Sequence, residues 1–337
     1  MTSGVLLLGA LIVGQSGQPA GAPAFRFPSG LTMDPSGNLI LADRGAHYVF
    51  RIDVKTGAVT VVAGTGQSGF SGDGGPAREA MLRNPEWVEF GPNGDLYLAD
   101  RGNHRVRRID AKTGVITTIA GTGVEAHSGD GGPAGKAGLT NPFGLTLDGA
   151  GHLFIFDTEA HCIRRVDAQT GIIATVIGST ARGFSGDGGP ATKATLQRPH
   201  NGVFDEQGRL VFGDSFNQRI RRWDPKTGTI TTIAGSGEQG SASDGAAAAR
   251  APFMYFGAMV YDSAGNLIFT SLDNRLLMIE AATDKIRVLA GSGEFSTPYG
   301  LVRGANGDLF VADAENRRVR RIDGRTGAIH TLAGEGR

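Results

Sequence analysis

Short runs of alternating hydrophobic and polar residues recur along the chain, and polar turn residues separate them. Between Pro85 and Gly123 there are four such runs, at 87–90, 96–99, 106–109 and 115–119. Alternation with a period of two is typical of a strand that buries one face. Glycine and asparagine occupy the junctions, where tight hairpins require a positive φ. This stretch therefore predicts four antiparallel strands in one sheet.

The four-strand pattern is present in six copies. The turn glycine between the first two runs marks each copy: Gly37 and Gly94 are 57 positions apart, and this step occurs four times before one of 42 between Gly265 and Gly307. A single sheet of this size is not stable alone, and radial stacking of such sheets gives a propeller. We therefore predict an all-β fold, a six-bladed β-propeller of four-stranded antiparallel blades, as one domain over residues 27–337. Residues 1–26 form a lead-in.

The third run of the second copy carries a recognisable motif. It reads GNHRVRRID at 102–110, with LYLAD before it and TGVITTIAGTG after it. This pattern resembles the NHL repeat, which is named for its Asn-His-Leu-type signature. Copies two and six match well, whereas copy five (TSLDNRLLMIE) is degenerate. The GFSGDGGPA linkers are similar to those of bacterial NHL proteins and of the NHL domain of teneurins, so the resemblance implies the NHL type of propeller.

The overall composition restricts the classes of partner. Lys plus Arg and Asp plus Glu are each 33, so the chain has no net charge. A protein that binds nucleic acid through its overall field has an excess of basic residues, so nucleic acid is not an expected partner. Cys162 is the only cysteine, and therefore no disulfide can form within the chain.

The lead-in contains a nine-residue apolar run at 5–13, which is too short to span a bilayer. Small residues follow it up to Ala24, as at the end of a secretory signal peptide, although the basic start of such a peptide is missing. We expect a secreted or periplasmic protein on this basis. The alternative is an extra outer strand that helps to close the ring, since LIVGQSG at 11–17 resembles VAGTGQSG at 62–69.

Four of the linkers between copies share an aspartate followed by small residues. These aspartates are Asp73, Asp130, Asp187 and Asp244. Proline in the first turn of a short helix loses no hydrogen bond, so we predict a short helix capped by the Asp or Gly. A calcium site is the alternative, but each linker offers one carboxylate where calcium needs six to eight oxygens. The linker at 294–297 lacks this segment, which predicts that one face of the ring is open near copies five, six and one.

In a propeller the first strand of each blade lines the central channel, and ligands bind where those strands enter it. One channel column is filled mostly by small residues, from Gly30 to Gly300, but Trp87 and Asn201 depart from it. Departures from a repeat's own rule mark functional or strained sites. We therefore predict a ligand site at the channel mouth. Its candidate residues are Glu86, Trp87, Glu89, Phe143, His200, Asn201, Tyr255 and Tyr299.

Two of these residues also have a structural interpretation. Trp87 would then fill an otherwise hollow channel, and Glu89 would pair with Arg303 of the sixth copy. A Trp87→Ala variant separates the two interpretations. Weaker ligand binding with an intact fold would indicate a ligand contact, and unfolding would indicate a plug.

Other polar residues belong to the repeat itself. His47, His104 and His161 share one column and are predicted to be parts of a turn. Tandem arginines on the third strands, such as Arg107 and Arg108, face opposite sides of the sheet. We expect them to pair with the aspartates that end the second strands. Those aspartates are Asp43, Asp100, Asp157, Asp214 and Asp313.

The function predicted from these patterns is a monomeric binding module that holds a small molecule, a peptide or a protein at the channel mouth. The alternative is a metal-dependent enzyme with one divalent ion, calcium or zinc, in the channel. Six-bladed relatives include an amidating lyase with histidine-bound zinc, and lactonases with Glu, Asn and Asp around an ion. His200 is the only histidine in the channel column, and Glu86 or Glu89 with Asn201 supplies two of the three lactonase ligand types. No catalytic residue is assigned.

Overall fold

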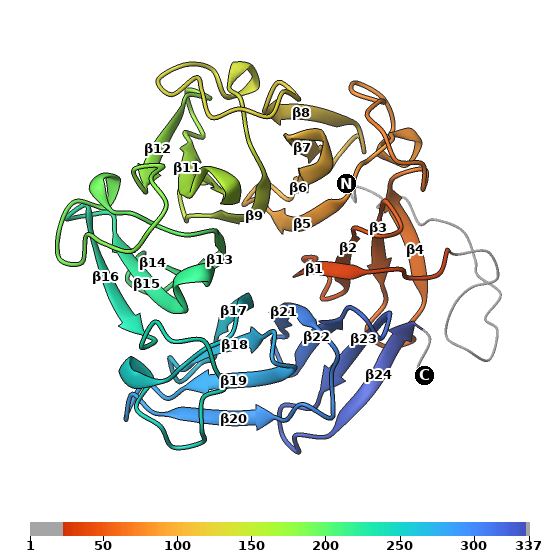
Figure 1. The fold of residues 1–337 in the computed structure, drawn as a ribbon. Coiled ribbons are helices and arrows are strands. Elements are labelled where there is room, and N and C mark those ends of the chain that lie inside the picture. Colours follow the sequence, from red (N-terminus) through yellow and green to blue (C-terminus); the bar gives the residue numbers. More distant parts are fainter. Residues whose placement is uncertain (1–22, 335–337) are drawn as a thin grey trace, which may run out of the picture.

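The computed structural model describes residues 23–334, which form six four-stranded antiparallel sheets arranged as a ring (Figure 1). Within each sheet the strands follow one another in sequence order from the channel to the rim. The all-β, six-bladed propeller predicted from the repeats is thus confirmed.

The strands of blades one to three are β1 Pro28–Met33, β2 Leu39–Asp43, β3 Tyr48–Ile52, β4 Val59–Ala63, β5 Pro85–Phe90, β6 Leu96–Asp100, β7 Arg105–Ile109, β8 Ile116–Ala120, β9 Pro142–Leu147, β10 Leu153–Asp157, β11 Cys162–Val166 and β12 Ile173–Ile177. Those of blades four to six are β13 Pro199–Phe204, β14 Leu210–Asp214, β15 Arg219–Asp224, β16 Thr229–Ala234, β17 Phe256–Tyr261, β18 Leu267–Ser271, β19 Arg275–Ile279, β20 Ile286–Ala290, β21 Pro298–Arg303, β22 Leu309–Asp313, β23 Arg318–Ile322 and β24 Ile329–Gly334. Seven short 3₁₀ helices join them: η1 Ala77–Glu79, η2 Arg101–Asn103, η3 Ala134–Lys136, η4 Thr158–Ala160, η5 Ala191–Lys193, η6 Ser215–Asn217 and η7 Ala248–Arg250.

The first strands of neighbouring blades approach one another closely around the channel. A Cβ added to Gly30 would lie 2.7 Å from the Cα of Trp87, and one added to Gly144 would lie 2.2 Å from the carbonyl oxygen of His200. Real Cβ atoms do not tolerate such distances, so these positions require glycine. The small residues of the channel column are therefore there to let adjacent blades meet.

The hydrophobic cores lie between adjacent sheets. Between blades one and two, for example, Val49 and Ala63 pack with Leu98 and Ile116, and the linker contributes Leu82. Each sheet is thereby buried on both faces, which is the arrangement that the repeats require.

Four of the connections between blades carry an extra segment, which we call a flap: residues 69–82, 126–139, 183–196 and 240–253. Each flap pairs with the fourth strand of the blade that follows it. In the first, Gly74 N–H donates to the Ile116 carbonyl at 2.8 Å, and Ile116 N–H donates to the Gly75 carbonyl at 3.0 Å. The flaps therefore lie against the outer strands of the ring, not over the channel.

The helix-capping role predicted for the flap aspartates is wrong. In η1 the residue before the helix is Pro76, in an extended conformation and with no capping side chain. Asp73 instead forms an ion pair with Arg107 at 2.8 Å. The guanidinium of Arg107 is completely buried and has no contact with water. A buried charge is costly unless it is paired, and the Asp73 carboxylate provides that pairing.

The repeat histidines and arginines mostly occupy the places predicted for them. His47, His104 and His161 all have a positive φ at the turn before the third strand. Arg107 and Arg221 pair with the second-strand aspartates at 3.3 and 3.2 Å. Arg164 and Arg320 differ: neither forms an ion pair with the aspartate that ends the second strand of its own blade, Asp157 or Asp313, within the described residues.

The ring closes between blade one and blade six without exchange of strands. Blade six is built wholly from residues 298–334, and β1 packs on β21 across the seam. Phe25, predicted to belong to the lead-in, is 3% exposed and contacts Phe50 with ring centroids 5.4 Å apart. Of the lead-in predicted at 1–26 as a signal-like segment or an extra strand, residues 1–22 lie outside the described part of the chain. None of the helices in 23–334 has the length and apolar character needed to cross a membrane.

Candidate functional site

One end of the channel is formed by the starts of the six first strands and by the ends of the second strands. The second residue of β5, β9, β13 and β21 is Glu86, Phe143, His200 and Tyr299, respectively. Because these strands converge on the channel, their equivalent residues meet at its mouth. Four of the predicted site residues are thereby placed at the same level of the ring.

A continuous row of aromatic rings crosses this mouth. Successive ring centroids lie 6.2, 5.9, 4.4, 6.1 and 4.4 Å apart. The row runs in the order Phe27, Tyr299, Phe143, His200, Phe216 and Tyr255. Offset and edge-to-face contacts at these separations are favourable. The row links Phe27, which precedes the first strand of blade one, and Tyr299 of blade six to residues of blades three, four and five.

His200 is part of this row as a neutral ring. It is buried and stacks on Phe143 with an angle of 15° between the planes, and its Nδ1 lies 3.3 Å from the Phe256 carbonyl oxygen. Burial lowers the pKa of His200 to about 4. The imidazole therefore carries no charge at neutral pH and serves as an aromatic surface.

Two arginines share one buried carboxylate at the other side of the mouth. Glu86 is fully buried, and its two oxygens accept from Arg101 Nη1 at 2.8 Å and from Arg44 Nη1 at 3.4 Å. Both arginine side chains remain 29% exposed. Two positive charges against one negative charge leave the mouth with a net positive charge on this side.

The same guanidinium groups lie over the aromatic row. Arg44 is 3.7 Å from the ring centroid of Phe27, and Arg101 is 5.3 Å from that of Phe143. These are cation–π distances, which hold the planar groups in fixed positions. Burial, and after it the Glu86 carboxylate, raise the pKa of Tyr299, so its phenol stays neutral.

Arg44 and Arg101 were not among the residues predicted from the sequence. They follow the aspartates that end the second strands, and comparison of this column would have identified them. Its members are Arg44, Arg101, Thr158, Ser215, Leu272 and Ala314. In this column only blades one and two carry a charged residue. The sequence analysis compared the first strands alone, and these arginines follow the second strands.

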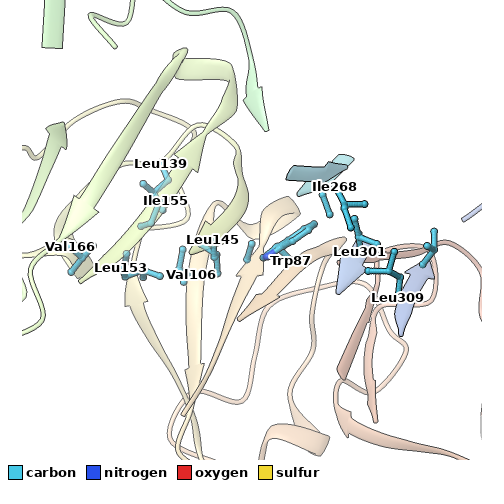
Figure 2. Packing of buried hydrophobic residues seen from close by; sticks show 14 of the residues in the cluster. Trp87, Val106, Leu139, Leu145, Leu153, Ile155, Val166, Ile268, Leu301 and Leu309 are labelled. Atoms are coloured by element: carbon cyan, nitrogen blue, oxygen red, sulfur yellow. The ribbon is translucent and has the colours of Figure 1, made fainter. Parts of the chain in front are cut away.

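Trp87 lies deeper, in the largest of the hydrophobic clusters. It is 4% exposed and belongs to one cluster with Ala258 of blade five. Figure 2 shows it between Leu145 of blade three and Leu301 of blade six. Its indole Nε1 has no hydrogen-bond partner in the part of the chain that the structure describes. The packing agrees with the interpretation of Trp87 as a filler of the channel.

Glu89 and Asn201 are bonded within the protein. Glu89 accepts from Thr32 Oγ1 at 3.4 Å, and burial raises its pKa to about 7. The Asn201 side-chain oxygen accepts from the N–H of Gly202. Within residues 23–334 the predicted ion pair of Glu89 with Arg303 does not form, and the Arg303 side chain donates instead to Ser263 Oγ at 3.4 Å.

The structure does not bring the predicted metal ligands together. Within residues 23–334 no three His, Cys, Asp or Glu side chains are grouped so that they could hold a metal ion. The sequence pattern placed Glu86, Glu89 and His200 near one another, but each is bonded to a different part of the protein.

A pocket of about 220 Å³ adjoins one end of the aromatic row. It is lined by Glu159, His161, Arg182, Gln197, Arg198 and Phe216. The guanidinium of Arg198 lies 4.7 Å from the ring centroid of Phe216, so the pocket continues the arginine and aromatic surface. A larger pocket of about 350 Å³ lies between blades four and five beside Asp205 and Tyr261, at the other end of the first strands.

Comparison with known proteins gives consistent matches along the chain. A family model described as NHL repeat matches residues 82–109, and one described as Teneurin NHL domain matches residues 121–185. NHL repeat-containing protein 2 of Bos taurus is 27% identical over 330 residues, which are 89% of this chain and 39% of that protein. Protein SUPPRESSOR OF QUENCHING 1, chloroplastic, of Arabidopsis thaliana is 27% identical over 89% of this chain and 25% of its own length. The chain thus spans less than half of these animal and plant relatives.

Solved structures match the ring as a whole. A streptogramin B lyase superimposes with a TM-score of 0.59 at 15% identity, over 94% of this chain and 86% of its own. A chain of a nidogen/laminin complex superimposes with a TM-score of 0.60 at 15% identity, over 87% of this chain and 92% of its own. Similarity at this level of identity shows the fold alone.

Proposed function

We propose that this chain, a six-bladed β-propeller of NHL repeats, is a binding module that holds a peptide, a small molecule or a segment of a protein at the channel mouth. The observation that carries the proposal is the pair of arginines on one buried carboxylate, set beside a row of aromatic rings. A rigid ring holds these groups in place before a ligand binds, so little conformational entropy is lost on binding.

The chemistry of the mouth favours a ligand with an anionic group attached to a flat apolar group. Arg44 and Arg101 present more donors than Glu86 can accept, and planar guanidinium groups are suited to carboxylate or phosphate oxygens. The partly exposed ring of Phe27 offers a stacking surface beside Arg44, and the partly exposed rings of Phe216 and Tyr255 offer two more at the other end of the row.

A fragment screen tests this assignment. The probes are aryl carboxylates and their matched carboxamides, and binding is detected by ligand-observed NMR. We expect carboxylates to bind more often than amides, and to lose binding in the Arg44→Gln and Arg101→Gln double variant. An Arg165→Gln variant is the control, because Arg165 is a partly exposed arginine that pairs with Asp167 away from the mouth.

Equal binding of carboxylates and amides would contradict the proposed chemistry. If the double variant still bound every carboxylate probe that the parent protein binds, the binding site would not be the channel mouth at Arg44 and Arg101. Near-UV circular dichroism of both variants checks that the aromatic row is intact.

A further inference from the structure

The flaps of blades two, three and four each cover a buried arginine on the third strand. Arg107 bonds to the Asp73 carboxylate at 2.8 Å and to the Ser71 carbonyl at 3.0 Å. Arg221 bonds to Asp187 at 2.9 Å and to the Ser185 carbonyl at 3.1 Å. Arg164 makes the same two contacts, with Asp130 and Ser128. All three guanidinium side chains are completely buried.

Blade five shows that the arginine belongs with the flap aspartate. Its third strand carries Leu277 in the arginine column. Among the described residues, 23–334, the aspartate of its flap, Asp244, accepts only from the backbone N–H of Val288.

Blade six has the arginine but no flap. Arg320 lies in the same column of β23, yet only residues 291–297 join β20 to β21. Its side chain is 12% exposed, and its contacts are Glu294 at 3.6 Å and Thr331 Oγ1 at 3.2 Å. Glu294 is itself half exposed, and such an ion pair contributes little. Burial, with Arg318 nearby, lowers the pKa of Arg320, which reflects a guanidinium that is incompletely compensated.

The junction without a flap has an open pocket. A pocket of about 320 Å³ lies between blades five and six, and Leu289, Ile322 and Gly327 are among its lining residues. The equivalent residues between blades one and two are Val62, Ile109 and Gly114, and they line a pocket of about 310 Å³. There the flap residues Pro76, Ala77 and Arg78 form one wall of the pocket, and the pocket between blades five and six has no such wall.

The edge of the outer strand is open as well. In blades two to five one isoleucine at the start of the fourth strand exchanges two backbone hydrogen bonds with the flap. These residues are Ile116, Ile173, Ile230 and Ile286. The equivalent residue in blade six is Ile329, and no backbone hydrogen bond links it to a residue outside its own sheet within residues 23–334.

We infer that the cleft between blades five and six binds an extended segment of a partner protein with the chemistry of a flap: an aspartate followed by glycine, proline and alanine. The segment would pair with the edge at Ile329, place its carboxylate on Arg320 in exchange for Glu294, and seat its alanine in the pocket. Addition of a strand to an open edge is a recurrent mode of peptide recognition. The site is separate from the channel mouth and does not depend on the function proposed there.

The charge of the cleft selects this occupant over the chain's own lead-in. Residues 1–22 contain no aspartate or glutamate, so they cannot supply the carboxylate that Arg320 lacks. A second copy of the chain has four aspartate-bearing flaps. Three of these aspartates are held in ion pairs within their own ring, and the fourth, Asp244, accepts from the N–H of Val288 in its own ring.

The direct test uses a synthetic peptide of residues 69–82, GFSGDGGPAREAML, with the whole protein in calorimetric titrations. We expect binding that weakens at least tenfold when the peptide aspartate is replaced by asparagine, or when the protein carries Arg320→Leu. The leucine reproduces the residue found in blade five. Arg165→Leu is the matched control and should bind the peptide as the parent protein does.

A second variant keeps the test decisive if Arg320→Leu does not fold. Glu294→Gln removes the competing carboxylate from an exposed linker, and it should tighten peptide binding several-fold. No detectable binding at millimolar peptide, equal binding of the asparagine peptide, or no gain from Glu294→Gln would overturn the inference. Self-association of the protein that is abolished by Arg320→Leu would also overturn it, because the occupant would then be a second copy.

Discussion

At the scale of single residues, Glu89 is the group whose ionisation should be visible in stability. Its usual pKa of 4.5 applies to the unfolded chain, and burial raises it to about 7 in the folded protein. Between these values the unfolded chain has lost the proton and the folded protein still holds it, so the free energy of unfolding falls as pH rises. Each pH unit in this interval corresponds to about 1.4 kcal/mol.

Glu89→Gln should remove this loss. Urea unfolding at pH 5 and at pH 8 measures it: the parent protein should lose more stability between the two values than the variant does. The same loss in both proteins would show that Glu89 ionises as freely in the ring as in water.

Trp87→Ala tests whether the indole is a structural filler. The side chain is almost completely buried among residues of several blades. Truncation of a buried Trp removes about 3–5 kcal/mol of stability. Urea unfolding followed by far-UV circular dichroism measures the change. A loss of stability below about 1 kcal/mol would show that the fold does not depend on the indole. Trp87 would then again be a candidate ligand contact.

Residue types in the repeat columns predicted one part of the mouth and missed the other. Glu86, Phe143 and Tyr299 could be predicted because each directly precedes the channel column in its first strand. Arg44 and Arg101 were missed because their partner, Glu86, is 42 and 15 positions away in the chain. Only the closed ring brings the three groups together.

At the scale of elements, the flap aspartates should contribute unequally. Asp73→Asn weakens the ion pair of a buried guanidinium, and a hydrogen bond to a charged group is worth about 1.5–3 kcal/mol. Asp244→Asn is the matched control, since Leu277 stands where the arginine would be. Thermal unfolding of the two variants should show the larger decrease in Tm for Asp73→Asn. Equal decreases in Tm would show that the ion pair of Asp73 adds no stability beyond what Asp244 contributes without an arginine.

The strands could be predicted from the sequence and the flaps could not. Alternation and turn residues depend on neighbours in the chain, so the predicted run at 96–99 differs from β6 by one residue. The flap aspartates were read as caps because Asp-Gly-Gly-Pro-Ala suits the start of a helix. Their actual partner, as for Asp73 and Arg107, is 34 positions away and is not visible in a local pattern.

At the scale of the whole molecule, the seam between blades one and six depends on side-chain packing. Phe25 fills the blade-one side of it and is nearly completely buried. Phe25→Ala should lower the free energy of unfolding by about 3–5 kcal/mol. Phe70→Ala is the control, because Phe70 is 41% exposed on a flap, and it should cost much less. Guanidinium titrations compare the two, and equal costs would show that the seam is closed by other contacts.

The seam also has a consequence for how such a ring is built into longer polypeptides. Phe25 and Ala333 belong to the same hydrophobic cluster, so the chain enters and leaves the described ring at one place. A unit with this property can be spliced between two other domains and hold them as near neighbours, with no need to thread the chain through the disc. Such a unit can be inserted into different proteins in the course of evolution. Two relatives agree with this, since the matched region makes up 25% and 39% of their own length.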